Sequence, residues 1–299
     1  MDLKQLKHFV AIVDHGSFLK AASALAISQP AVSRSIAKLE DANQTKVLDR
    51  TTRGLQMTPA GERLYRRAKL IQNETEAAHA EIRAGGETVV PFRIGVAPLF
   101  EGEVLPDAVT SFCICEPDAH IQVRSGLFPR LARELSEGSL DVVVSNIPFA
   151  PVENNLTAQA LFDIDVLCLV SKDHPLAHQE HVPFADTITY PWAVIDEENA
   201  NALYSYMFST QGTTKSPIQL RTNSLNLLRN LVRQPPWVTM IPHHMVEAEI
   251  QAGDLKVIDL GDQHLVRKGG ILFRTAMKDE PRLKRFLDHI TASYAQHLA

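Results

Sequence analysis

The segment between residues 17 and 40 constrains the fold more than any other part of the chain. Apolar residues recur at helical spacing from Phe18 to Leu25, and a second periodic run begins after Ser28. Ser17 and Ser28 stand where helix N-caps are expected, and Pro30 falls in a first helical turn, where its missing N–H removes no intrahelical bond. A further amphipathic helix is expected at about residues 2–14. Three short helices are therefore predicted at the N-terminus.

The helix that begins after Ser28 has two unlike faces. Its apolar face comprises Val32, Ile36 and Leu39. The opposite face combines an amide, a hydroxyl, a guanidinium and small apolar groups, from Gln29, Pro30, Ala31, Ser33, Arg34, Ala37 and Lys38. Glutamine can pair with adenine, arginine with guanine, and small apolar groups can touch thymine methyls in the major groove. The pattern predicts a helix-turn-helix whose third helix reads double-stranded DNA.

The charge distribution agrees with such a partner. Residues 1–72 hold 12 Lys and Arg against 6 Asp and Glu, whereas residues 73–299 hold 18 against 29, within a net charge of -5. A basic end on an acidic body is expected when one end meets phosphate and the other does not.

Two motifs make this interpretation specific. The strings SFLKAASALAISQPAVSRSIAKLE and DRTTRGLQMTPAG resemble the signature of LysR-type transcriptional regulators. The resemblance implies an N-terminal all-α winged helix-turn-helix with a long linker helix, followed by a two-subdomain α/β effector domain built like a periplasmic binding protein. The matching residues are Phe18, Ala21, Ala22, Leu25, Ser28, Gln29, Pro30, Ala31, Val32, Ser33, Ile36, Leu39, Glu40, Arg50, Thr58, Ala60 and Gly61.

The resemblance also implies which residues meet DNA. The stretch from Lys46 to Met57 matches the wing, whose arginines and threonines can donate to phosphate or the minor groove. For Arg50 a structural pairing with a carboxylate is an equal alternative. The predicted DNA-binding residues are Phe18, Ala21, Ala22, Ser28, Gln29, Pro30, Ala31, Ser33, Arg34, Lys38, Arg50, Thr51 and Arg53.

The chain departs from the family pattern after the third helix. Asn43-Gln44 replaces an apolar residue and a glycine, and Val47-Leu48 replaces Leu-Phe. We expect these changes to alter the turn and the position of the wing. The base-reading residues are not affected by them.

A linker helix is expected from Pro59 to a hinge at Gly85-Gly86. Its apolar positions alternate in steps of four and three, which is the spacing of a helix that pairs with another. The alternative is a helix that packs on its own domain. The resemblance implies antiparallel pairing, and hence a homodimer or a dimer of dimers. The seam comprises Leu64, Ala68, Ile71, Thr75, Ala78 and Ile82.

From Pro91 onward short apolar strands alternate with helices, which indicates an α/β architecture. We expect a winged helix-turn-helix domain at residues 1–58, the linker at 59–88 and the effector-binding domain at 89–299. By resemblance, the last divides into subdomain I (about 91–162 and 270–299) and subdomain II (about 163–269), joined by two crossing strands. The predicted strands are Phe92–Ala97, His120–Arg124, Asp141–Ser145, Asp165–Ser171, Trp192–Ile195, Trp237–Ile241, Lys256–Ile258 and Gly270–Phe273.

A small-molecule effector is expected in the cleft between the subdomains. The predicted effector-binding residues are Pro98, Leu99, Phe100, Glu101, Phe128, Ser145, Asn146, Pro148, Tyr204, Thr222 and Asn223. For each of them, packing of the core or of a loop is the alternative. Gln234-Pro235-Pro236-Trp237 replaces a Gly-x-Gly turn of the family and is expected to alter the cleft wall.

Other functions are less well supported by the residues. Three cysteines and scattered histidines indicate no metal site, and no G-x-G-x-x-G follows a strand, so no cofactor is expected. An enzyme or a solute-binding protein in which the α/β part carries the main activity is the alternative function, although Glu101 and Glu103, or Asp173 and His174, have no nucleophile nearby. The chain shows no signal segment or membrane span, so a cytoplasmic regulator is expected, with RNA polymerase as a further candidate partner.

Overall fold

The structure is a computed structural model, and it describes residues 1–51, 54–83, 91–102, 104–148, 151–153, 155–196, 198–209, 216–260 and 265–297. The chain forms two compact units. The first comprises Met1–Pro91 with Arg133–Leu140, and the second comprises Phe92–Ala132 with Asp141–Ala299. The predicted hinge at Gly85-Gly86 lies outside the described residues. None of the described helices is long and apolar enough to cross a bilayer.

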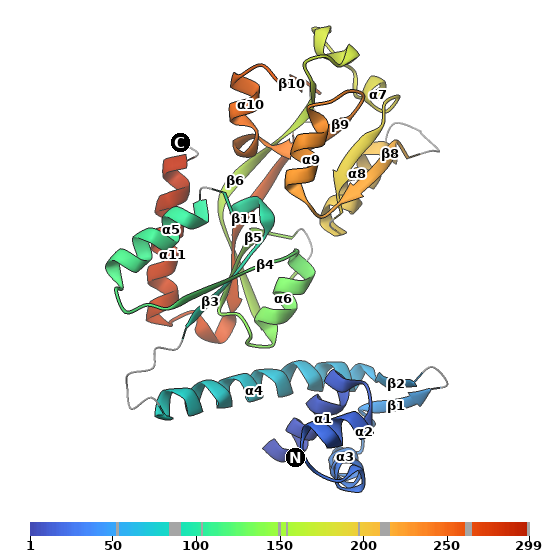
Figure 1. The fold of residues 1–299 in the computed structure, drawn as a ribbon, viewed down its shortest axis with the longest axis vertical. Helices are drawn as coiled ribbons and strands as arrows, with labels where there is room; N and C mark the ends of the chain where they lie inside the picture. The colour runs from blue at the N-terminus through green and yellow to red at the C-terminus, as the bar shows by residue number, and fades with distance from the viewer. Residues whose placement is uncertain are drawn as a thin grey trace. The chain divides into compact units, whose positions relative to one another are not determined.

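The first unit contains three short helices, a two-stranded wing and one long helix (Figure 1). These elements are α1 (Leu3–His15), α2 (Phe18–Ala24), α3 (Gln29–Asn43), β1 (Leu48–Thr51), β2 (Gly54–Met57) and α4 (Pro59–Arg83). Phe9, Ile12, Val32 and Leu39 are almost fully buried where the helices meet. The apolar periodicity of the sequence thus becomes a single small core.

Asp2 and Gly16 fix the ends of α1. The Asp2 carboxylate accepts from the backbone N–H of Gln5 at 2.7 Å, and the Gln5 side chain accepts in return from Asp2 N–H at 3.0 Å. Gly16 ends the helix in the left-handed region, with φ of 64°. Ser17 and Ser28 occupy the N-cap positions of α2 and α3, but neither side chain makes a capping hydrogen bond.

The second unit is built on a mixed sheet with nine strands among the described residues, in the order β4-β3-β5-β11-β6-β9-β7-β8, with β10 also pairing with β6. The strands are β3 (Phe92–Val96), β4 (Ile121–Ser125), β5 (Val142–Asn146), β6 (Leu156–Ser171), β7 (Trp192–Ile195), β8 (Ile218–Thr222), β9 (Val238–Pro242), β10 (Leu255–Ile258) and β11 (Leu265–Arg274). The helices are α5 (Val104–Cys115), α6 (Phe128–Ser136), α7 (Phe184–Thr187), α8 (Glu198–Ser209), α9 (Leu225–Val232), α10 (Glu247–Gln251) and α11 (Pro281–His297).

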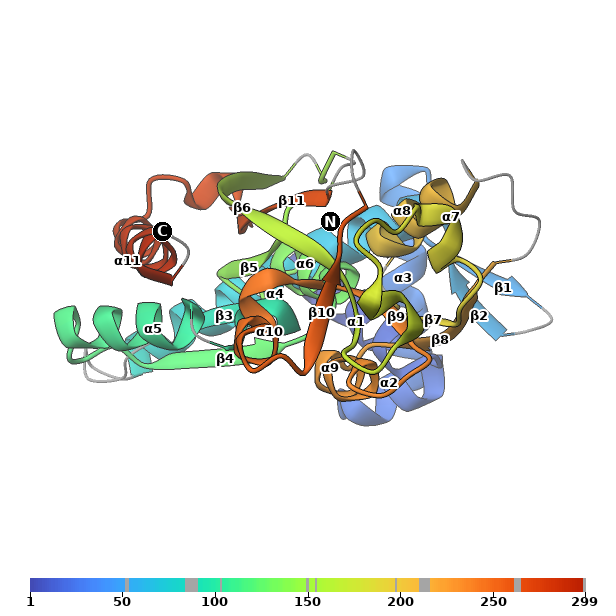
Figure 2. The ribbon, with the colours of Figure 1, turned by 90° about the horizontal axis from the view of Figure 1, so that it is seen from above.

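Two long antiparallel strands, β6 and β11, join the halves of this unit (Figure 1). On one side of them α5 and α11 lie side by side (Figure 2). Phe112 of α5 and Phe286 of α11 pack edge to face. On the other side Trp192 of β7 is fully buried in a second core, and its indole N–H donates to the Thr187 carbonyl at 3.0 Å. Each half therefore has its own core.

Gly269 and Gly270 permit the close approach of β6 and β11. The pairing register shifts between these two glycines. A Cβ atom on Gly269 would lie 1.9 Å from Cε2 of Phe162, and one on Gly270 would lie 2.1 Å from the Gln159 carbonyl oxygen. A larger residue at Gly270 would push the two strands apart, whereas one at Gly269 would displace the Phe162 ring.

Asp141 links three strands where β5 begins and β11 ends. Its carboxylate accepts from the backbone N–H of Arg93 at 2.8 Å and from the Arg93 guanidinium at 2.8 and 3.1 Å, and Arg274 Nη2 lies 3.6 Å away. Asp141, at the start of β5, therefore links β3, β5 and β11.

The Gln234–Trp237 segment is held by a buried histidine. His174 Nε2 lies 3.1 Å from the Pro236 carbonyl oxygen, while Nδ1 accepts from Leu176 N–H at 3.1 Å, so the ring donates through Nε2 and is neutral. Burial lowers the pKa of His174, although the bond to Pro236 opposes the shift.

Candidate nucleic-acid interface and ligand cavity

The turn between α2 and α3 is tight because Ala26 adopts a left-handed conformation. Ala26 has φ of 53°, and its N–H donates to the Ser23 carbonyl at 3.1 Å. The N–H of Ile27 donates to the Ala22 carbonyl at 3.0 Å, so the last turn of α2 closes on itself. This turn sets α3 across α2, as in a helix-turn-helix.

The predicted reading face of α3 is open to solvent. Gln29, Pro30, Arg34 and Lys38 are exposed, as is Ser28 before the helix. Ala31 and Ser33 are half-buried, and the opposite side packs into the core through Val32, Ile36 and Leu39. The exposed amide and guanidinium are therefore available to base edges.

Two predicted DNA contacts need correction. Ala21 and Ala22 are only 0% and 3% exposed, because α2 packs against its neighbours through these small side chains. They have no surface to offer DNA, and their role is to permit the close approach of helices. Phe18 is half-buried and packs against the same core.

Glu40 anchors the wing. The sequence showed it as one of the residues that match the family signature but did not indicate this role. Its buried carboxylate accepts from the N–H groups of Val47 and Leu48 at 2.9 and 3.3 Å and from Lys46 Nζ at 2.7 Å. Burial alone raises the pKa of Glu40, but these hydrogen bonds outweigh it and hold the pKa below its ordinary value. The end of α3 and the start of β1 are thus fixed to one another.

Thr58 and Gly61 hold the same segment from the other side. Thr58 Oγ1 donates to the Lys46 carbonyl at 2.7 Å and accepts from Gly61 N–H at 3.0 Å, which caps α4. A Cβ atom on Gly61 would lie 2.0 Å from the Val47 carbonyl oxygen. Glycine is therefore required where α4 passes the wing, and the TPAG motif is explained by this contact.

The wing itself is an antiparallel pair in which Arg50 faces Leu55 and Thr51 faces Gly54. Arg50 and Thr51 therefore lie on β1, close to the turn of the hairpin. Arg53, the third predicted donor, falls between the described residues.

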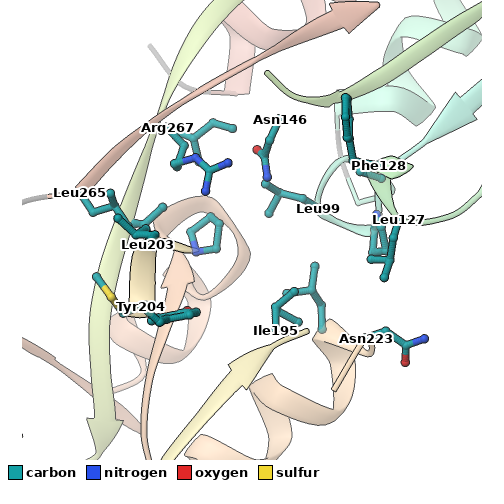
Figure 3. Close-up of a pocket in the computed structure, with 17 residues that line it drawn as sticks. Leu99, Leu127, Phe128, Asn146, Ile195, Leu203, Tyr204, Asn223, Leu265 and Arg267 are labelled. Atoms are coloured by element: carbon teal, nitrogen blue, oxygen red, sulfur yellow. The ribbon is translucent and has the colours of Figure 1, made fainter. Parts of the chain in front are cut away.

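A cavity of about 90 Å³ lies between the two halves of the second unit (Figure 3). Most of its lining is apolar, and the polar groups come from Asn146, Tyr204, Asn223 and Arg267. The lining residues are Ala97, Pro98, Leu99, Leu127, Phe128, Asn146, Ile164, Val166, Ile195, Leu203, Tyr204, Asn223, Leu225, Met240, Pro242, Leu265 and Arg267. Its volume is enough for several water molecules or one small organic molecule.

One face of the sheet forms a wall of this cavity. Leu265 pairs with Val166 and Arg267 with Ile164. Val166 pairs in turn with Pro242. Since paired residues of antiparallel strands project to the same side of a sheet, β6, β9 and β11 present these side chains together.

The structure brings together about half of the predicted effector-binding residues. Those that line the cavity are Pro98, Leu99, Phe128, Asn146, Tyr204 and Asn223. The remaining predicted residues lie outside its lining: Phe100, Glu101, Ser145, Pro148 and Thr222.

Local structure accounts for several of these exclusions. Phe100 is 1% exposed in the core, and Ser145 projects from the opposite face of β5 to Asn146. Glu101 accepts a hydrogen bond from Ser125 Oγ, and Thr222 Oγ1 accepts from Ser224 N–H at 3.0 Å.

Arg267 is the lining residue that sequence reasoning missed. It lies in the run HLVRKGG, next to a second basic residue, Lys268. The two basic residues point to opposite faces of β11: Lys268 pairs with Asp163 and is exposed, whereas Arg267 is only 6% exposed. The sequence signal that could have identified Arg267 is the alternation of side chains along a strand, which puts Leu265, Arg267 and Gly269 on one face.

None of the three cysteines is among the described residues that line this cavity. Cys113 and Cys115 lie on α5, two residues apart, so their side chains point in different directions. Cys168 is 3% exposed on β6, and burial raises the pKa of its thiol to about 12.

Comparison with known proteins identifies both the helix-turn-helix segment and the α/β domain. Residues 3–62 match the model of the bacterial regulatory helix-turn-helix protein, lysR family, and residues 86–295 match the LysR substrate binding domain. The regulator OxyR of Escherichia coli (strain K12) is 26% identical over 283 residues, which is 94% of this chain and 87% of that protein.

Solved structures share the fold. Full-length OxyR from Pseudomonas aeruginosa, in a variant form, superimposes with a TM-score of 0.63 at 20% identity and covers 97% of this chain and 94% of its own. Full-length CbnR complexed with its target DNA gives a TM-score of 0.61 at 20% identity, over 98% of this chain and 100% of that one.

The helix-turn-helix head and the α/β domain with its interior cavity define a ligand-responsive DNA-binding transcription regulator. The chain belongs to the LysR family of such regulators.

Proposed function

We propose that the chain reads a dyad operator as a homodimer or a dimer of dimers, with α3 in the major groove and an effector in the cavity of the second unit. The observation that carries this is the reading face of α3. Its exposed Gln29 and Arg34 stand over a buried apolar side, on a helix fixed at both ends by its turn and by Glu40. Small changes in the wing or the turn would therefore move the reading groups.

The surface along α1 and α4 favours pairing of two chains. Leu64 and Ala68, the first positions of the predicted seam, pack into the core of their own unit. Farther along, Ile71 and Ile82 are 39% and 81% exposed on α4, and Ile71 lines a groove with Leu3 of α1. An exposed apolar stripe of this kind is expected at an interface. We place the seam on the second half of α4.

The effector acts only through different affinities for two arrangements of the assembled regulator. Relatives named as transcriptional activators, among them HcaR of Escherichia coli (strain K12), favour RNA polymerase as a further partner. A promoter target also favours a cytoplasmic location.

Footprinting on the promoter regions next to the gene tests the reading helix. Gln29→Ala and Arg34→Ala should each weaken operator binding by about 1–3 kcal/mol and relax the preference at one base position, because each removes a base contact. Arg63→Ala, which removes an exposed arginine of α4, is the control for lost charge. Unchanged footprints for both α3 variants would contradict the assignment.

Sedimentation of the full chain tests the seam. Ile82→Glu should shift the protein toward monomer, because it places a charge on the apolar stripe. Tyr206→Glu, at a residue 68% exposed on α8, is the matched control. An unchanged oligomer in the Ile82 variant would remove α4 from the interface.

A further inference from the structure

Residues 133–140, here called the α6 turn, belong to the first unit together with α4. The segment contains the end of α6 and the residues that follow the helix. Gly138 adopts a left-handed conformation with φ of 75°, and the N–H of Ser139 donates to the Glu134 carbonyl at 2.8 Å. These are the features of a glycine that ends a helix sharply.

The α6 turn packs on the middle of α4. Asn73 Nδ2 donates to the Glu137 carbonyl at 2.7 Å and lies 3.2 Å from Ser139 Oγ. A Cβ atom on Gly138 would lie 2.6 Å from Leu70 Cδ1 and 3.7 Å from the Cβ atom of Asn73. Because glycine has no such atom, the backbone of the α6 turn can lie directly against α4.

The side chain of Glu137 is enclosed at this contact. Glu137 is 8% exposed, and among the described residues no group donates a hydrogen bond to its carboxylate. Burial raises the pKa of Glu137. An ionised carboxylate that is buried without hydrogen bonds is costly, so the packed α6 turn favours the protonated carboxyl group.

Charged groups of α1, α4 and α6 surround this carboxyl group. Arg133 and Lys69 act to lower its pKa, and they are opposed by two negative groups, Asp14 and Glu134. Lys69 Nζ lies 3.4 Å from the Asp14 carboxylate, which also accepts a hydrogen bond from the Tyr65 hydroxyl. The lysine is thus engaged with a carboxylate of α1, and the basic groups do not outweigh the effect of burial.

We propose that the α6 turn is a proton-controlled latch on α4, which holds more firmly when the Glu137 carboxyl group is protonated. Closing the latch takes up a proton, so the latch tightens as the pH falls toward the ordinary carboxyl pKa of about 4.3. It acts on the helix that follows the wing, since α4 begins at Pro59 and β2 ends at Met57. The inference goes beyond the proposed function and does not depend on it.

Hydrogen exchange of the full chain, measured by mass spectrometry, tests the contact. Asn73→Asp replaces the donating amide with a carboxylate that faces the Glu137 carbonyl. It should speed the exchange of residues 133–140 about threefold to tenfold, because a hydrogen bond is lost and the latch opens more often. Gln72→Glu is the matched control, since Gln72 bonds Glu76 within α4. Equal exchange of residues 133–140 in the two variants would overturn the latch.

Glu137→Gln tests the proton. Glutamine has nearly the same shape and no charge, so at about pH 7.5 this variant should slow the exchange of residues 133–140 about threefold or more. After correction for the chemical exchange rate, the wild type should show slower exchange at about pH 5 than at about pH 7.5, and the variant should not. Unchanged exchange in Glu137→Gln would remove the proton from the latch. Faster exchange would mean that the ionised carboxylate holds the α6 turn through Arg133 or Lys69, and it would overturn the proposal.

DNA binding measured on the same samples separates this inference from the proposed function. A chain that binds its operator but shows no effect of Asn73→Asp or Glu137→Gln on exchange keeps its function and loses the latch. A chain that shows both effects but does not bind DNA keeps the latch and loses the proposed function.

Discussion

The DNA-reading unit and the ligand cavity are assembled from contacts of very different range. In the first unit the reading helix and the wing are fixed by Glu40, Thr58 and Gly61, which all meet the segment from Lys46 to Leu48. In the second unit the wall of the cavity joins residues from Asn146 to Arg267 across β5, β6, β9 and β11. The first site depends on neighbours in sequence and the second on strand register.

This difference predicts that the two sites will tolerate substitutions differently. A substitution in the first unit alters one hydrogen bond or one cap, and the reading face moves by a small amount. A substitution in β6 or β11 that shifts the pairing by one residue turns every lining side chain away from the cavity. We therefore expect the largest effects of single substitutions at the glycines between β6 and β11.

Gly269→Ala should be the most damaging change considered. The added methyl group would lie 1.9 Å from Phe162 Cε2 and 2.8 Å from Ile164 Cδ1, so the Phe162 ring must move from its place in the core. Overpacking of this kind costs about 3 kcal/mol of unfolding free energy. Urea denaturation measures the loss, and ligand binding should fall with it because Arg267 lies two residues away.

Gly102→Ala is the matched control, because a Cβ atom there meets nothing within 4 Å. Should Gly269→Ala prove as stable as Gly102→Ala, the close approach of β6 and β11 would not be what fixes the wall of the cavity.

The same difference in range decided what the sequence could predict. The bounds of α1, the start of α3, and β7 were predicted to within a residue, because local periodicity and caps specify them. In contrast β6 begins at Leu156, nine residues before the predicted Asp165, and β8 was not predicted at all. Both contain polar residues that become acceptable only when partner strands cover the backbone.

The residues that line the cavity differ in the same way in how well the sequence predicts them. Lining residues next to strand ends, such as Pro98 and Asn146, could be predicted from the general position of ligand sites in α/β proteins. Arg267 could not, because its neighbours in the cavity are brought there by pairing with β5 and β6. The left-handed conformation of Gln44 was not predicted either, because glycine usually marks it and the sequence indicated only that the turn would be altered where Gln44 replaces the family's glycine.

Glu40→Gln tests whether the first unit really depends on a local anchor. The substitution keeps the shape but removes the charge that two backbone N–H groups and Lys46 share. The loss should be about 1.5–3 kcal/mol of unfolding free energy, as for hydrogen bonds to a charged group. Operator affinity should also fall, because the wing is no longer held to α3.

Lys46→Met separates the charge of Lys46 from the backbone contacts. The Lys46 side chain is 71% exposed, so solvent screens its ion pair with Glu40 and the pair contributes little to stability. If the lysine variant lost as much stability as the glutamine variant, the anchor would be the ion pair and not the backbone N–H groups.

Acidification should weaken the second unit through His174, by less than either change above. Well above the ordinary histidine pKa of about 6.5, His174 is neutral in both the folded and the unfolded chain, and its contribution to stability is intact. Because burial lowers the pKa of the folded His174, the unfolded chain takes up a proton first as the pH falls, and unfolding becomes easier. His174→Asn, which keeps an acceptor for Leu176 N–H, should reduce this pH dependence.

Urea midpoints at about pH 7.5 and about pH 5.5 provide the measurement, since these values lie on either side of the ordinary histidine pKa. His8 of α1 has a pKa lowered in the same direction by burial and is present in both proteins, so it supplies a common background. An identical loss in the wild type and His174→Asn would assign the dependence to His8 or to carboxylates.

The smallest effect, and the one most confined to the first unit, should come from Gln44→Gly. Gln44 ends α3 with φ of 48° and ψ of 35°, a left-handed conformation that costs a side-chain-bearing residue about 1–2 kcal/mol. Glycine avoids that cost but has more freedom to lose on folding, so a net gain of about 0.5–1 kcal/mol is expected. Thermal unfolding measures the gain. Gln72→Gly, within α4, should instead be destabilising, because a helix interior disfavours glycine. A loss of stability in Gln44→Gly would mean that the glutamine side chain stabilises the turn by more than its backbone conformation costs. Glutamine in place of the family's glycine would then be a stabilising substitution.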